Sequence, residues 1–86
     1  MAQPSNTASS TARIEELIRD LVGEDDTAKG LIREHLEAAR FYLHGAMPAE
    51  YLFNLELAEG LLSELHDQEL QHRIREFVRS QRSTAV

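Results

Sequence analysis

The residue pair whose spacing best suits chemistry is a glutamate and a histidine near the C-terminus. Glu69 and His72 lie three positions apart, the E-x-x-H spacing with which carboxylate-bridged metal sites place two ligands on one helix face. Such sites also need a second E-x-x-H pair and two further carboxylates from facing helices. Because the sequence holds no second pair, we predict neither a metal centre nor a metal cofactor.

Nucleophilic catalysis and phosphate binding find no better support. No serine lies in a G-x-S-x-G turn, and the chain has no cysteine. Its four glycines are isolated from one another, whereas a phosphate-binding loop gathers them together. The Asp-Ser-Leu motif to which acyl carrier proteins attach their prosthetic group is also absent. We therefore predict a protein that is not an enzyme, with no catalytic residue and no cofactor.

Basic residues that could contact an anion are concentrated at the C-terminus. Residues 41–72 hold six acidic side chains and no lysine or arginine, whereas residues 73–86 hold four arginines and one glutamate. An acidic field disfavours binding to phosphate backbones, so nucleic-acid binding would depend on these arginines alone. They could instead contact an acidic partner, or complement the dipole of a helix end. The four are Arg73, Arg75, Arg79 and Arg82.

Helices must position all of these residues. Apolar side chains recur at helical spacing along most of the chain, and no segment alternates as a half-buried strand does. The pattern predicts an all-α fold with helices over about 10–23, 26–44, 48–65 and 68–79. The first helix, capped by Ser10 or Thr11, could be loosely attached to the others.

Four residues predict where these helices begin, end or meet. Gly45 is expected to be the left-handed residue that ends the second helix, and Pro48 suits the first turn of the third. Asp67 is expected to cap the last helix. Gly60 lies inside the third helix, where a glycine costs about 1 kcal/mol relative to alanine. A second helix crossing closely at Gly60 would explain that cost.

The chain is long enough for one domain. We expect residues 1–9 to be a disordered leader, residues 10–82 a single helical domain, and residues 83–86 a flexible tail. The start of the chain has no pattern of a secretory signal, and no apolar run approaches the roughly 20 residues that cross a bilayer. We therefore expect a cytoplasmic protein that does not bind a membrane.

Apolar residues lie on two sides of the predicted third helix. One row is Tyr51, Leu55, Ala58, Leu62 and Leu65, and a second is Phe53, Leu57 and Leu61. A helix of this kind needs apolar partners on both sides, and a chain of 86 residues has few elements to supply them. A second copy of the chain would meet this need; the alternative is that the residues complete a monomeric four-helix core.

We therefore predict a small three- to four-helix bundle built on an antiparallel helical hairpin and assembled as a homodimer. Aromatic and leucine side chains at a buried centre would carry most of the binding energy. The residues expected at this interface are Phe41, Tyr51, Phe53, Leu57 and Leu61.

The order of features from Leu31 to Val78 resembles that of the AriR-type regulators of biofilm formation and acid resistance in bacteria, described as connector proteins of two-component systems. The likeness consists of a helix ending in Leu43, His44 and Gly45, a short link, the leucine-rich segment NLELAEGLLSEL, a break at residues 66–68, and the segment LQHRIREFV. It implies an all-α homodimer that acts through protein contacts in a signalling pathway, with some DNA association. It implies no catalytic residue.

Taken together, these features predict a small non-enzymatic regulatory or adaptor protein that acts by helix-mediated protein binding in bacterial signalling or gene regulation. Its partners would be itself and an unidentified protein. The alternative is a DNA-binding regulator that uses the basic C-terminal helix.

Overall fold

The computed structural model describes residues 5–21 and 27–85, and within these ranges the chain is helical with no strand. The elements are α1 (Ser5–Asp20), α2 (Thr27–His44), α3 (Pro48–Gly60), a short 3-10 helix η1 (Leu62–Glu64) and α4 (Gln68–Ala85). The all-α prediction is confirmed. Residues 1–4 of the expected leader, and the expected boundaries at Gly23 and Asp26, lie outside the described residues.

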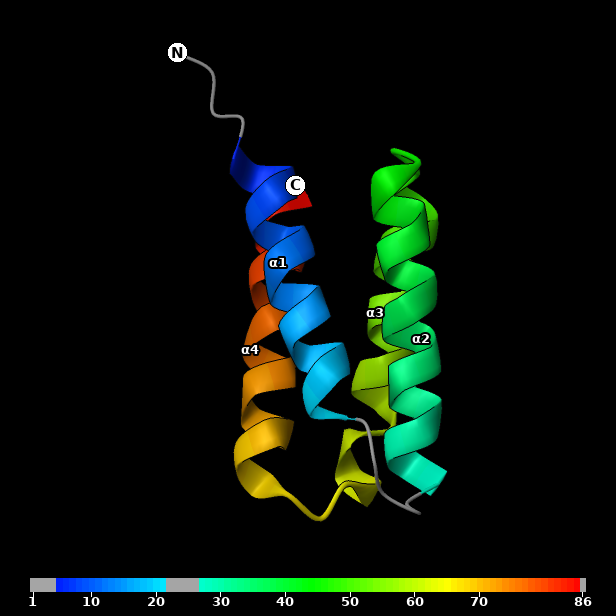
Figure 1. Ribbon diagram of the computed structural model, residues 1–86, viewed down its shortest axis with the longest axis vertical. Coiled ribbons are helices and arrows are strands. Elements are labelled where there is room, and N and C mark those ends of the chain that lie inside the picture. Colours follow the sequence, from blue (N-terminus) through cyan, green and yellow to red (C-terminus); the bar gives the residue numbers. More distant parts are fainter. Residues whose placement is uncertain (1–4, 22–26, 86) are drawn as a thin grey trace.

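The four helices form two layers of two. Helices α1 and α4 lie on one side of the molecule and helices α2 and α3 on the other (Figure 1). Helix α1 contacts α2 and α4, and α3 contacts the same two helices. The connection between α2 and α3 is only three residues long, and this pair makes the most extensive contact in the fold.

One hydrophobic core lies between the two layers. Every helix contributes buried side chains to it, and among the described residues the buried ones are all apolar except for the hydroxyl of Tyr51. Ile14, Leu17 and Ile18 of α1 and Leu21 directly after it belong to this core, so the apolar face of α1 packs against the other helices. The row predicted along the third helix, Tyr51, Leu55, Ala58, Leu62 and Leu65, is buried throughout.

Helices α1 and α4 both extend beyond their predicted ends. Helix α1 begins at Ser5, so Ser10, the expected cap, lies within the helix and donates its hydroxyl to Gln81 Oε1 of α4 at 3.0 Å. Helix α4 continues past Arg79 to Ala85, which places most of the expected flexible tail inside a helix. Contacts of Gln81 and Arg82 with α3 explain the extension, since packing stabilises a helix more than propensity does.

The short break before α4 is close to the one that the sequence predicts. Helix α3 ends at Gly60 and η1 follows, so the third helical segment reaches Glu64 in two pieces. Asp67 caps α4 as expected: its Oδ1 accepts a hydrogen bond from the Leu70 amide at 3.1 Å. The side chain of Gln71 also donates to the carbonyl oxygen of Leu62, which joins η1 to α4.

The prediction for Gly45 was wrong by one position. The left-handed residue after α2 is Ala46, with φ of 56°. The Met47 amide donates to the Tyr42 carbonyl at 3.0 Å and the Ala46 amide to the Leu43 carbonyl at 3.2 Å. This is the Schellman pattern, in which the residue after the C-cap is left-handed. Glycine usually occupies that position, so the sequence signal favoured the wrong residue.

The expectation for Gly60 was also wrong. A side chain added at Gly60 would meet no atom within 4 Å, so no second helix crosses closely there. Gly60 is the last residue of α3, where the chain passes into η1. Its helical cost is small at this position because the regular helix ends there.

Candidate protein-binding surface

Two phenylalanines are the most exposed large apolar side chains in the described part of the chain. Phe41 of α2 is 71% exposed and Phe53 of α3 is 60% exposed, whereas the third phenylalanine, Phe77, is completely buried in the core. Leu31, Met47 and Leu57 are also exposed. Single exposed apolar residues are ordinary, but a cluster of them marks a binding surface. The question is therefore whether these side chains share a face.

The ion pairs of α2 show which way its sides face. Arg40 pairs with Glu15 of α1 at 3.9 Å, so the side of α2 that carries Arg40 faces α1. Successive residues are separated by 100° around a helix, which places Leu31 and Ala38 on the side opposite Arg40. Phe41 lies next to them, directed away from the buried positions of α2. These three residues therefore belong to the side of α2 that faces away from α1.

The ion pairs of α3 show in the same way which side of this helix faces α4. Arg82 of α4 contacts Glu59 at 2.8 Å and Glu56 at 3.6 Å, so the side of α3 that carries these glutamates faces α4. Phe53, Leu57 and Leu61 follow at four-residue intervals on the other side.

Because α2 and α3 form one layer, these two sides contribute to a single surface facing away from α1 and α4 (Figure 1). We call this surface the outer face. Its apolar residues are Leu31, Ala38, Phe41, Phe53, Leu57 and Leu61.

Four of the five predicted interface residues belong to the outer face. Phe41, Phe53 and Leu57 are exposed on it, and Leu61 lies at its edge, half-buried against the core. Tyr51 is the exception, because it is a core residue with only 6% of its surface exposed. Sequence reasoning missed Leu31 as a residue of this face. Its spacing of seven residues from Ala38 was the available signal.

Tyr51 connects three helices through its hydroxyl group. The hydroxyl donates to Gln81 Oε1 of α4 at 2.7 Å, and the same oxygen accepts from the Ser10 hydroxyl of α1 at 3.0 Å. Burial raises the pKa of Tyr51 to about 12. This hydrogen-bonded cluster has a structural role at one end of the bundle, and it satisfies a polar group that the core would otherwise leave unpaired.

All charged side chains placed on the outer face are acidic. Glu34 and Glu50 lie between its apolar residues by helical position, and both are exposed. The lysine and the two arginines of α2 lie on its other side, and α3 contains no lysine, arginine or histidine. None of the ion pairs between described residues involves Glu34 or Glu50.

The C-terminal arginines do not form a free basic patch. Arg73 pairs with Asp20 at 2.8 Å and Arg79 with Glu76 at 3.2 Å, while Arg82 contacts the two glutamates of α3. Arg75 is the exception, with no ion pair to a described residue. The basic end of the chain thus lies against acidic residues of the same chain.

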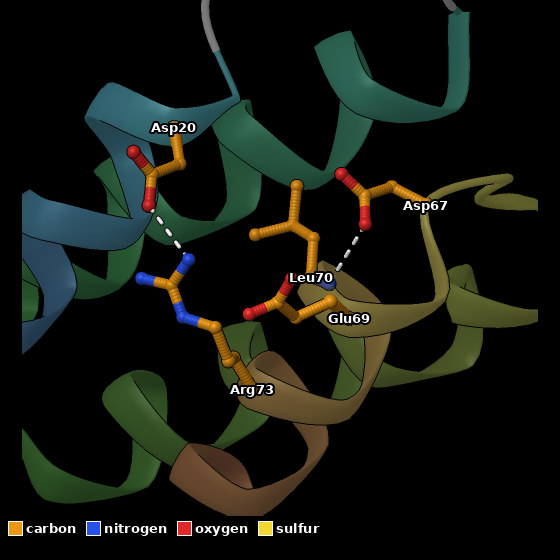
Figure 2. Close-up of a pocket in the computed structure, with 5 residues that line it drawn as sticks. All are labelled: Asp20, Asp67, Glu69, Leu70 and Arg73. Carbon is orange, nitrogen blue, oxygen red and sulfur yellow. Dashed lines mark hydrogen bonds and ion pairs between the residues drawn. The ribbon is translucent and has the colours of Figure 1, made fainter.

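A hollow of about 300 Å³ lies between the end of α1 and the start of α4 (Figure 2). Its charged groups are mostly engaged within the fold: Asp20 pairs with Arg73, and Asp67 caps α4. Leu70 and Glu69 complete the lining, and only the Glu69 carboxylate makes no such contact. Most of the charged side chains that line the hollow therefore stabilise the fold.

Among the described residues, no three histidine, aspartate or glutamate side chains are arranged to hold a metal ion. None of the described helices is both long and apolar enough to cross a membrane. Comparisons with protein-family models, with curated proteins and with solved structures found no match to this chain.

Proposed function

We propose that this chain is a small non-enzymatic regulatory or adaptor protein that binds another protein chain through the outer face. The observation that carries the proposal is the exposure of Phe41 and Phe53 beside Leu57, on helices whose other sides are already packed. Aromatic side chains supply large contact areas, and they are enriched among the residues that dominate binding energy.

The size of the outer face supports this proposal. From the exposed fractions of its phenylalanines and leucines, its apolar area is on the order of 400 Å². That is about half of the roughly 800 Å² that each partner contributes to a stable interface, in which apolar area makes up somewhat more than half. Polar side chains around the phenylalanines and leucines would supply the remainder.

Self-association through the outer face is the first property to measure. In light scattering at several concentrations, a homodimer would have twice the chain mass of 9.8 kDa. Leu57→Glu places a carboxylate at the centre of the outer face and should abolish either self-association or binding of another protein. Ala12→Glu adds the same charge at an exposed position of α1 and should change neither.

Each variant must first retain the helical circular dichroism spectrum and the melting temperature of the parent chain. If Leu57→Glu then leaves both the mass and the binding of any captured protein unchanged, the outer face is not the binding surface. The resemblance to bacterial connector proteins remains a prediction about the pathway in which such binding would act.

The alternative prediction, DNA binding by α4, has less support. Three of its four arginines are paired with carboxylates of the same chain, and a phosphate contact by any of these three would have to replace such a pair. We expect no DNA binding in a gel-shift assay at physiological salt. Binding that Arg75→Gln and Arg79→Gln abolish together would contradict that expectation.

A further inference from the structure

The charges of the outer face favour one class of partner. Glu34 and Glu50 are exposed on this face, and no lysine or arginine of α2 or α3 shares it. Arg33 and Arg40 lie on the side of α2 that faces α1, where they pair with Glu37 and Glu15. The face thus combines exposed phenylalanines and leucines with carboxylates that form no ion pair with a described residue.

The dimensions of the outer face suit a single helix. Its apolar residues on α2 extend from Leu31 to Phe41, a rise of about 15 Å or three helical turns. Phe53 and Leu57 form a parallel row on α3. A helix laid along two such rows inserts side chains at i, i+3, i+4 and i+7, the usual pattern of helix recognition.

We infer that the outer face binds a basic amphipathic helix of a partner protein, with an apolar stripe against Phe41, Phe53 and Leu57 and with lysine or arginine side chains near Glu34 and Glu50. This inference rests on the proposed function and names the partner of the same surface. Opposite charges beside an apolar contact steer association and select against partners of like charge.

A second copy of the chain fits this surface less well. In a two-fold dimer the same patch occurs on both sides of the interface, so both copies would bring Glu34 and Glu50 and neither would bring a lysine or arginine of this face to pair with them. Like charges placed opposite one another disfavour association. Nucleic acid is disfavoured for the same reason, since phosphates would approach an acidic face.

The test uses two synthetic 18-residue helical peptides that share one leucine stripe and differ only in flanking residues, all lysine in one and all glutamate in the other. Fluorescence anisotropy of the labelled peptides measures their affinity for the full-length chain. We expect the lysine peptide to bind saturably, and the glutamate peptide to bind more weakly by tenfold or more, the effect of about 1.4 kcal/mol. Equal affinity for the two peptides would overturn the inference.

Two pairs of variants separate the outer face from the overall charge of the chain. The double variant Glu34→Gln with Glu50→Gln should weaken binding of the lysine peptide by about twofold to thirtyfold, since exposed charge pairs contribute about 0.2–1 kcal/mol each. The matched double variant Glu16→Gln with Glu69→Gln removes two exposed carboxylates from α1 and α4 and should have little effect. Equal weakening by both would mean that net charge alone attracts the peptide, which would overturn the inference.

A third variant distinguishes failure of the inference from failure of the proposed function. Phe53→Ser with Leu57→Ser removes apolar contact at exposed positions and should abolish binding of the lysine peptide. Unchanged binding by that variant would contradict both the inference and the proposed function. A stable homodimer that Leu57→Glu dissociates would overturn the inference alone, because the outer face would then bind a second copy.

Discussion

The hydroxyl of Tyr51 shows how one buried polar atom can connect three helices. It donates to Gln81, which also accepts from Ser10, so α1, α3 and α4 meet at one amide oxygen. Removing the hydroxyl leaves Gln81 with one donor fewer. We therefore expect Tyr51→Phe to lower the free energy of unfolding at neutral pH by about 1 kcal/mol, as measured by urea denaturation.

The same residue predicts a loss of stability at alkaline pH. Burial raises the pKa of Tyr51 from 10.0 to about 12, so the folded chain favours the neutral phenol. Its contribution to stability is complete below pH 10 and is lost as the pH rises from 10 toward 12. Because phenylalanine cannot ionise, Tyr51→Phe should reduce the alkaline loss seen in urea unfolding at successive pH values.

Tyr42→Phe is the matched control for that titration. Tyr42 is half-buried, and its ring meets that of Phe41 edge-on at 5.4 Å. Tyr42→Phe keeps Tyr51, so its free energy of unfolding should still fall between pH 10 and pH 12. If the free energy of unfolding of Tyr51→Phe falls equally, groups other than Tyr51 cause the alkaline loss of stability.

Ala46 carries a backbone conformation that glycine adopts more easily. Its φ of 56° lies in the left-handed region, which costs roughly 1–2 kcal/mol for a residue with a side chain. Ala46→Gly removes this cost, but glycine also gives the unfolded chain more conformational freedom, which offsets part of the stabilisation. We expect a net stabilisation of about 0.5–1 kcal/mol in urea denaturation.

A glycine introduced in a helix should have the opposite effect. Ala12→Gly, at an exposed position within α1, should destabilise the chain by about 1 kcal/mol. If Ala46→Gly destabilises the chain by a similar amount, the left-handed turn after α2 is not formed in solution.

At the scale of the elements, periodicity predicted the helices well and their ends less well. The rows at Ile14 and Tyr51 were predicted because core packing imposes the 3.6-residue period directly on the sequence. The starts and ends depend on contacts between distant residues, such as Ser10 with Gln81, and no local pattern records them. The pattern placed Tyr51 and Phe53 in different rows, but it could not show which row the rest of the chain covers, so Tyr51 was wrongly included in the expected interface.

Replacing Gly30 tests how much the helix propensity of α2 contributes to the stability of the chain. It lies within α2, and a side chain at this position would meet no atom within 4 Å. Gly30→Ala should therefore stabilise the chain by about 1 kcal/mol, as measured by the urea midpoint. Gly60→Ala, at the last residue of α3, should give a smaller gain. A larger gain at Gly60 would mean that α3 and η1 form a continuous helix in solution.

The whole molecule is divided into a closed core and an apolar outer face. Phenylalanine occurs in both parts: Phe77 is buried in the core, and Phe53 is exposed on the outer face. Phe77→Ala should lower the free energy of unfolding by about 3–5 kcal/mol, whereas Phe53→Ala should change it by less than about 1 kcal/mol. Comparable losses at the two positions, from thermal or urea unfolding of the isolated chain, would mean that Phe53 is covered in solution.

The start of α1 and the end of α4 lie at the same end of the bundle, in the layer opposite to the outer face (Figure 1). The chain can therefore be attached to a solid support, or joined to a fluorescent protein, at either terminus without covering Phe41 or Phe53. An immobilised chain would present its binding surface to the solution in a uniform orientation. Surface-based binding measurements should then agree with those made free in solution.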